Sequence, residues 1–387
     1  MMSSISETNE ADLLEKIIFR RQFILGPVSF RPTKFFDDIS LSHHLILSYH
    51  QDLSTISQSN DDTRLTLIGT VVDPFSPEKS NNDIVRSLLS KATDIDSILA
   101  SSTPLSGRWL IIYQDSKETY IIPDPCCLRT AYYLDGSDEF WCGSQPEIIK
   151  ANHHLTFSND PHLLSFLLHP HFTSKESAWV GSKSIYQNCF RLQANHYLSV
   201  NCRKQVRFYP KDELLELTVN EIVSKACSIL QGTFVGITRQ HNVIQALTAG
   251  WDSRVLLAAS RQVSSEIDYY MDRQGRIPEH HPDVIIPKLL SNKLHLNFVV
   301  KNSHQNVPGW FVSALSSNVT GGRVLPKTRN IFSFLLQNET RMRINGNVSE
   351  ICRNFYEKIN KISSENVHTK DLSHVMGYGD DLYALEQ

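Results

Sequence analysis

The chain has 387 residues, of which 41% are hydrophobic and 20% are charged, and its formal net charge is −3. This length is sufficient for two domains, and the composition is typical of a soluble globular protein. The nearly balanced charge argues against nucleic-acid binding, and no apolar stretch approaches the roughly 18 residues that a membrane span requires.

Seven cysteines are scattered along the chain without a C-x-x-C pair. An odd, scattered set argues against a disulfide framework or a zinc site and favours reduced thiols. The N-terminus is polar and has no signal-peptide core. We therefore expect a cytoplasmic protein.

The first half of the chain has the pattern of a sheet-rich domain. Residues 1–22 are expected to be a lead-in with one short helical turn around 11–19. Short apolar or alternating runs, separated by turn residues, then predict strands at 23–25, 45–49, 65–72, 108–113, 119–122, 131–134, 139–142, 196–200 and 205–209. Helical spacing occurs at 80–99 and 161–168. Many strands with few helices predict an α+β sandwich over residues 23–210.

The second half alternates between strand and helix. After a helix expected at 212–232, strands are predicted at 242–247, 267–271, 296–300 and 341–345, and helices at 252–262, 282–294, 311–316, 331–337 and 350–359. Regular βαβ alternation predicts a parallel, doubly wound α/β sheet over residues 211–387. Ligands of such sheets bind beyond the carboxyl ends of the strands, where residues 248–254, 271–276 and 345–350 are expected to gather.

The stretch QALTAGWDSRVLLAAS, residues 245–260, carries the most informative chemical pattern. A small-residue turn at 248–250 follows an apolar run, and Asp252 and Ser253 stand at the start of an apolar helix. The backbone N–H groups of a first helical turn and the helix dipole make such a turn an anion pocket. Thr248 and Ser253 would add hydroxyl donors, and Asp252 could hold a divalent cation against a phosphate. A helix N-cap at Asp252, without any ligand, explains the spacing equally well.

A second turn, NGNVSE at residues 345–350, repeats the order of strand, small residues and carboxylate. Beside the first turn, Asp252 and Glu350 would supply two carboxylates for one Mg²⁺ that bridges the phosphates of ATP. Ser349 and Glu350 could instead only cap a helix and complement its dipole. Asp272 and Arg273, after the second strand, are expected either near an adenine or ribose or in a plain turn.

Several of these stretches resemble one protein family. TAGWDSR at 248–254 resembles the pyrophosphate-binding loop of the asparagine synthetase family, S/T-G-G-x-D-S, with Ala249 where glycine is usual. GNVSEI at 346–351 is similar to that family's G-E-G-x-D-E. In the first half, LSGRWLIIY at 105–113, DPCCLRTAYY at 124–133 and FRLQANHYL at 190–198 resemble segments of class II glutamine amidotransferase domains.

The resemblance implies a domain organisation and a nucleotide site. It implies an N-terminal Ntn-type amidotransferase sandwich at 23–210 and an ATP-pyrophosphatase (PP-loop) domain at 211–387, C-terminally shortened, that binds ATP and Mg²⁺. Glu350 would ligate the metal together with Asp252. The implied ATP- and pyrophosphate-binding residues are Leu247, Thr248, Ala249, Gly250, Asp252, Ser253, Arg254, Met271 and Gly346.

Two departures from the family bear on activity. The N-terminal cysteine nucleophile of the amidotransferase is absent, because position 2 is Met2 and the first cysteine is Cys126. Asn347 stands where the family has a glutamate of the acid–base apparatus, and an amide cannot take up a proton near neutral pH. The sequence also ends at Gln387, before the helical region that supplies the family's catalytic lysine, so the catalytic residues stay unassigned.

The resemblance implies an ATP-dependent ligase that forms amide bonds. It would adenylate a small-molecule or peptide carboxylate and pass it to an amine without glutamine as nitrogen donor, as β-lactam synthetases and lasso-peptide cyclases do. The alternative is a nucleotide-binding pseudoenzyme or regulatory subunit of a biosynthetic complex. A partner protein that completes the site, or a homodimer, is compatible with both hypotheses.

Overall fold

The computed structural model describes residues 7–42, 44–60, 62–174, 179–303, 306–320, 326–336, 340–347 and 368–387. The chain divides into two compact units, each assembled from three segments. The first unit comprises Met1–Arg21, Gln51–Arg129 and Ala194–Asn347, and the second comprises Gln22–His50, Thr130–Gln193 and Val348–Gln387. The expected domain boundary between residues 210 and 211 stays a prediction.

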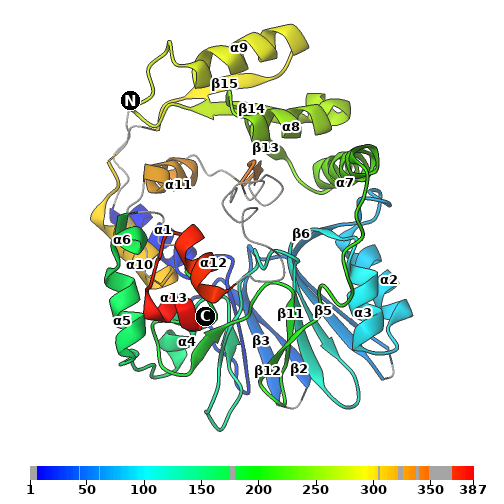
Figure 1. The fold of residues 1–387 in the computed structure, drawn as a ribbon, viewed down its shortest axis with the longest axis vertical. Helices are drawn as coiled ribbons and strands as arrows, with labels where there is room; N and C mark the ends of the chain where they lie inside the picture. Colours follow the sequence, from blue (N-terminus) through cyan, green and yellow to red (C-terminus); the bar gives the residue numbers. More distant parts are fainter. Residues whose placement is uncertain are drawn as a thin grey trace. The chain divides into compact units, whose positions relative to one another are not determined.

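An antiparallel sheet of six strands forms the earlier part of the first unit (Figure 1). Its order is β12 (Lys204–Arg207), β11 (His196–Ser199), β7 (Thr119–Pro123), β6 (Ser106–Gln114), β5 (Arg64–Val72) and β4 (Thr55–Ser59). The two longest strands, β5 and β6, pair along their whole length, from Arg64 opposite Gln114 to Val72 opposite Ser106.

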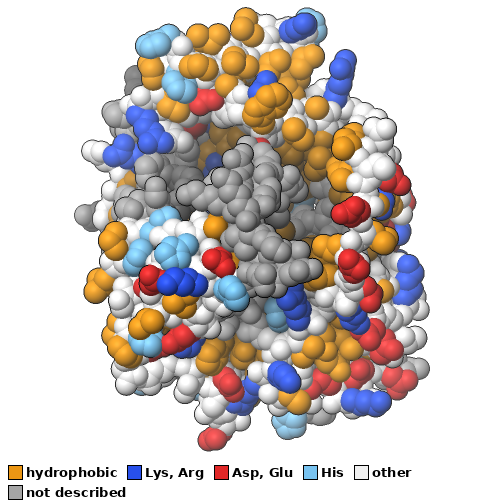
Figure 2. Space-filling view, in the orientation of Figure 1, with side chains coloured by type: hydrophobic (Ala, Val, Ile, Leu, Met, Phe, Trp, Pro, Cys, Tyr) orange, Lys and Arg blue, Asp and Glu red, His pale blue; other side chains and the backbone are white. Residues whose placement is uncertain are grey.

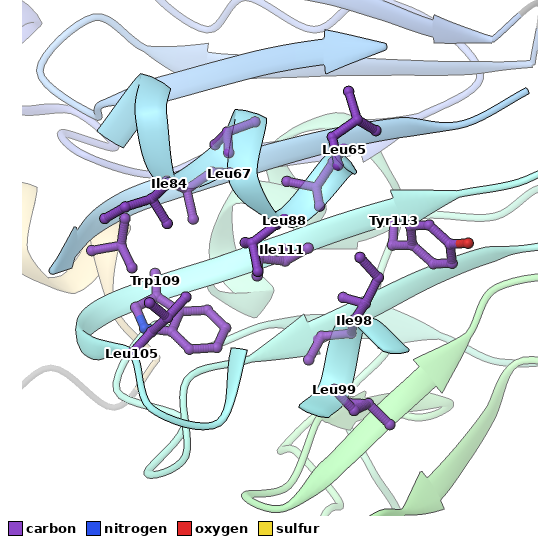
Figure 3. Close-up of a cluster of buried hydrophobic side chains, with 14 residues drawn as sticks. Leu65, Leu67, Ile84, Leu88, Ile98, Leu99, Leu105, Trp109, Ile111 and Tyr113 are labelled. Atoms are coloured by element: carbon purple, nitrogen blue, oxygen red, sulfur yellow. The ribbon is translucent and has the colours of Figure 1, made fainter. Parts of the chain in front are cut away.

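Two helices, α2 (Asn81–Lys91) and α3 (Ile95–Ser102), pack on this sheet, and their apolar side chains meet those of β5 and β6 (Figure 3). Ile84, Leu88 and Ile98 are at most 3% exposed there. Burying one such side chain stabilises the fold by roughly 1.5–3 kcal/mol. The single helix expected over 80–99 is two helices, because the Asp94 carboxylate accepts the N–H of Ser97 and starts a new one.

A four-stranded parallel sheet forms the later part of the first unit, in the order β15 (Phe298–Lys301), β14 (Ile267–Asp272), β13 (Val243–Ala246) and β16 (Met342–Ile344). The connections contain α8 (Trp251–Ala259), a 3₁₀ helix (Arg261–Glu266), α9 (Pro282–Leu294), α10 (Gly309–Asn318) and α11 (Pro326–Leu336). Phe334 of α11 packs on Ile244 and Tyr270 from one face of this sheet. The expected later parallel sheet is thus present, and its assignment to the ATP-pyrophosphatase type remains part of the proposal below.

The helix α7 (Val219–Gln240) connects the two sheets of the first unit. It starts seven residues later than the expected 212, because Thr218 and Glu221 form a capping box. Phe234 and Ile237 of α7 share one core cluster with Val72, the last residue of β5, and with the parallel sheet. A side chain at Gly232 would place its Cβ 1.9 Å from the carbonyl oxygen of Pro74, so only glycine permits this approach.

The lead-in is an element of the core rather than one helical turn. The helix α1 (Glu7–Ile17) has 11 residues. Ile17 packs with Phe311 of α10 and Phe332 of α11. The N–H of Phe19 also donates to the Asn318 side chain at 2.6 Å, which ties the end of the lead-in to the end of α10.

The second unit contains the other antiparallel sheet, in the order β10 (Cys189–Arg191), β8 (Tyr132–Leu134), β9 (Cys142–Gly143), β1 (Phe23–Gly26), β3 (Leu45–His50) and β2 (Phe36–Ser42). Its helices are α4 (Pro146–Asn152), α5 (Pro161–Leu168), α6 (Pro170–Ser174), α12 (Thr369–Val375) and α13 (Leu382–Glu386). Tyr383 of α13 lies 4.8 Å, between ring centroids, from Phe166 of α5. Across the described residues, no helix combines the length and apolarity that crossing a membrane requires.

Candidate functional site

The loop at 248–250 lies at the carboxyl end of β13. Leu247 is fully buried, and its N–H donates to the carbonyl of Tyr270 at 2.8 Å, which extends the pairing with β14 by one residue. The chain then turns, and Gly250 occupies the N-cap position of α8 without any side-chain cap. The alternative N-cap at Asp252 is wrong, because Asp252 lies inside the first helical turn. The first turn of α8 is therefore left without a side-chain acceptor at its cap.

Ser253 fixes the shape of this loop from inside. It is 7% exposed, and its hydroxyl oxygen accepts the N–H of Thr248 at 3.1 Å. The same hydroxyl lies 3.1 Å from the carbonyl oxygens of Thr248 and of Gly250, to which it donates. The hydroxyl predicted to contact a ligand is thus engaged by the loop itself.

A carboxylate from the next helix holds the tip of the loop. The N–H of Ala249 donates to Asp283, in the first turn of α9, at 2.9 Å. The following N–H, that of Gly250, donates to the hydroxyl of Thr248 at 3.1 Å. The hydrogen bond to the Asp283 carboxylate is charge-assisted, and such bonds are stronger than neutral ones like that to the Thr248 hydroxyl. Asp283 was not predicted, because an acidic residue early in a helix also matches the helix dipole, and only the tertiary structure reveals its partner.

Gly346, just beyond β16, lies against the start of α8. A Cβ on Gly346 would be 2.7 Å from the Cβ of Asp252 and 3.0 Å from its carbonyl carbon. This approach follows from the pairing of β13 with β16, in which Gln245 is opposite Ile344. The structure therefore brings two of the predicted turns, at 248–254 and at 346, to one place.

Two other predicted site residues, Met271 and Glu350, differ in what the structure shows of them. Met271 is buried near the end of β14, the strand beside β13. Glu350, the second predicted metal ligand, falls outside the described residues, as does the helix expected at 350–359. Within the described part of the chain, no group of three His, Cys, Asp or Glu side chains could hold a metal ion. The Mg²⁺ pair Asp252–Glu350 stays a prediction.

Arg254 points along α8. Its guanidinium lies 4.5 Å from the ring centre of Trp251, which is 71% exposed. Arg254 also lines a cavity of about 480 Å³ between α8 and α9, together with Leu257 and Leu290. Val255, Leu289 and Leu294 are exposed on the same two helices, and Figure 2 shows hydrophobic side chains gathered over this part of the surface.

Asp272 and Arg273 form a hydrogen-bonded turn. The carboxylate of Asp272 accepts the N–H of Ser303 at 3.0 Å and the N–H of Gln274 at 2.8 Å. Arg273 donates through Nε to the carbonyl of Ile277 at 2.7 Å. These contacts correspond to the plain-turn alternative.

Gln245, two residues before Leu247, is a buried polar residue in the central strand. It is fully buried, and neither atom of its amide group has a hydrogen-bond partner among the described residues. An unsatisfied buried amide costs free energy and is rare in native proteins. It lies on β13, between Tyr269 and Ile344 in the strand register.

Comparisons with known proteins give distant likenesses to solved structures. No family model and no curated protein matches the sequence. Among solved structures, the chain is similar to glutamine phosphoribosylpyrophosphate amidotransferase from B. subtilis complexed with ADP and GMP, with a TM-score of 0.31 and 11% identity over 66% of this chain and 61% of that chain. A structure titled as the allosteric regulatory enzyme of purine biosynthesis gives a TM-score of 0.31 and 11% identity, covering 67% of this chain and 62% of that chain. The chain thus spans about three fifths of the length of both structures, and a TM-score this low supports no conclusion about activity.

Proposed function

We propose that the protein binds ATP at the 248–254 loop and uses it to activate a carboxylate as an acyl-adenylate for amide-bond formation, without glutamine as nitrogen donor. The observation that supports this most is the strand order of the parallel sheet. From β13 the chain proceeds through β14 to β15, and it returns to the other side of β13 with β16. In open α/β sheets, ligands bind at the carboxyl ends of the strands where the order reverses in this way.

The residues at this reversal suit a phosphate in three respects. The loop after β13 leads directly into α8, whose first turn is not capped by a side chain. Backbone N–H groups at such a helix start, and the positive end of its dipole, favour an anion. Thr248 adds a hydroxyl group, and Asp252 stands beside Gly346, where a carboxylate could share Mg²⁺ with a bound triphosphate.

The alternative, a nucleotide-binding pseudoenzyme or regulatory subunit, is favoured by one contact. The negatively charged carboxylate of Asp283 accepts a hydrogen bond from the N–H of Ala249, at the tip of the same loop. A phosphate bound at that N–H would have to displace this carboxylate, because two anions cannot share one donor at close range without a cation between them. This requirement lowers the affinity for nucleotide under both hypotheses, and it opposes the repeated binding and release that a ligase needs for turnover.

A thermal-shift titration tests nucleotide binding. A ligand that binds only the folded state stabilises it by about 2.7 kcal/mol at a concentration 100 times its Kd. We expect MgATP to raise the melting temperature of the wild type and of Glu266→Gln, an exposed carboxylate at the opposite end of β14, but much less that of Asp252→Asn. If no nucleotide raises the melting temperature of the wild type, both hypotheses are wrong.

Pyrophosphate release separates the two hypotheses. A ligase should release pyrophosphate from MgATP when carboxylate and amine substrates are supplied, and Asp252→Asn should release less. Saturable ATP binding without pyrophosphate release, across a panel of small carboxylic acids and peptides, would leave the pseudoenzyme hypothesis.

A further inference from the structure

Three arginines from distant parts of the first unit form a cluster: Arg21 after α1, Arg108 in β6 and Arg129 after β7. Backbone contacts hold them together. Arg129 donates through Nη1 to the carbonyl of Arg21 at 3.2 Å, and Arg108 donates through Nε to the carbonyl of Leu128 at 2.8 Å. None of these three residues belongs to the 248–254 loop.

In the described parts of the chain, the arginine cluster has three positive charges near two carboxylates, Asp52 and Asp124, and it forms an ion pair with neither. Among the described residues, Arg21, Arg108 and Arg129 form no ion pair, whereas the neighbouring Arg20 is paired with Asp52 at 2.6 Å. The carboxylate of Asp124 is occupied by backbone N–H groups. Its oxygens accept from Leu128 at 2.9 Å and from the N–H of Arg129 at 2.8 Å.

The environment of the cluster makes this charge unfavourable. Burial, and then the charge of Arg108, lowers the pKa of Arg129 to about 9. Burial also lowers the pKa of Arg21 and of Arg108. All three side chains still carry a positive charge at neutral pH. Arg21 and Arg108 are nevertheless exposed, so a ligand from solution can reach them.

Two buried nitrogen atoms at this place have no hydrogen-bond partner. In the part of the chain that the structure describes, neither Nε of Arg129 nor Nε2 of His241 is satisfied. His241 is the C-cap of α7, and burial followed by the charge of Arg21 lowers its pKa. Buried donors without partners are rare in native proteins. An acceptor group with several oxygens would satisfy the Arg129 donor and would also offset the charge of the cluster.

We propose that Arg21, Arg108 and Arg129 bind an oxyanion, a phosphate or carboxylate group of a small molecule, at a site separate from the nucleotide loop. A planar guanidinium offers paired N–H donors that match the oxygens of such a group. The exposed side chains of Arg21 and Arg108 would meet the ligand first, and the unpaired Nε of Arg129 would be the donor that it satisfies.

The test uses the full-length chain and two probes, inorganic phosphate and acetate, titrated at constant ionic strength with chloride as the reference. Saturable stabilisation by phosphate or by acetate, above that by chloride, is expected, and the tighter probe identifies the chemical group. Arg129→Gln and Arg108→Gln should each weaken binding about tenfold or more, since a hydrogen bond to a charged group contributes about 1.5–3 kcal/mol. Arg20→Gln is the matched control, because Arg20 is already paired with Asp52, and its binding should stay unchanged.

Two results would refute the proposed site. One is the absence of saturable binding by either probe, and the other is an equal loss of affinity in Arg20→Gln and Arg129→Gln. Arg21→Gln keeps the outcome independent of folding, because among the described residues the Arg21 side chain makes no hydrogen bond. This variant should weaken binding, while its melting temperature without phosphate stays at that of the wild type. Asp252→Asn should bind the probes normally, so failure of the nucleotide site and failure of the arginine cluster are distinguishable.

Discussion

Replacing Gly346 by alanine tests the contact between the two turns of the candidate site. The new Cβ would lie 2.7 Å from the Cβ of Asp252, roughly 0.8 Å inside the 3.5 Å at which two carbon atoms normally meet. The next nearest atoms belong to the backbone of Asp252 and Ser253, which cannot rotate away. The end of β16 and the start of α8 must therefore separate.

The expected cost follows from two opposing terms. Overpacking of this kind destabilises by about 1–3 kcal/mol. Replacing glycine by alanine also reduces the conformational entropy of the unfolded chain, which stabilises the folded state by about 0.4–1 kcal/mol. Gly346→Ala should thus lose about 1–2 kcal/mol of stability. Gly309→Ala is the control, since no atom lies within 4 Å of its added Cβ, and it should gain about 0.4–1 kcal/mol.

Differential scanning fluorimetry of the two variants measures this difference. With an unfolding entropy of about 2.1 cal/mol/K per residue, a change of 1 kcal/mol shifts the melting temperature of a 387-residue chain by about 1.2 °C, so the two variants should differ by roughly 2–4 °C. Gly346→Ala should also bind MgATP more weakly than Gly309→Ala. Equal melting temperatures for the two variants would show that the turn at 346 does not pack against α8 in solution.

Two further predictions concern the same sheet. Asp283→Ala removes the acceptor of the Ala249 N–H, so hydrogen exchange at that amide should accelerate; unchanged exchange, measured by mass spectrometry or NMR, would show that the contact does not hold the loop. Gln245→Leu replaces a fully buried amide without hydrogen-bond partners by an apolar side chain of similar size, and should raise stability by about 1–3 kcal/mol. A lower urea midpoint for Gln245→Leu would mean that the amide has a partner, such as a buried water.

The elements that could be predicted from the sequence are those with both a periodic apolar pattern and a clear boundary. The helices at 161–168 and 282–294 have the expected limits, because proline occupies the first turn of each and the spacing is helical. The strands β2 and β4 were not predicted. Both lie at the edge of a sheet, and β4 has no fully buried residue, so its sequence lacks a strong alternation.

Other differences arise from contacts between distant residues. The helix α7 was expected to end near Gly232, yet it continues to Gln240, because the glycine allows close packing against Pro74 rather than a helix end. Leu214 and Leu215, expected to be helical, are exposed and precede the cap.

The position of the candidate loop after β13 could be predicted, because a strand, a small-residue turn and a helix follow one another in the sequence. The roles of Ser253 and Asp283 could not, since each depends on which backbone groups the folded loop presents.

The position of α7 has a consequence for recombination between related proteins. One helix contributes Phe234 and Ile237 to the core of the parallel sheet, while its Gly232 rests on the turn that follows β5. A hybrid that kept the parallel sheet and received a different antiparallel sheet would need a turn whose backbone fits that glycine. We therefore expect a productive crossover to preserve residues 72–77 along with α7.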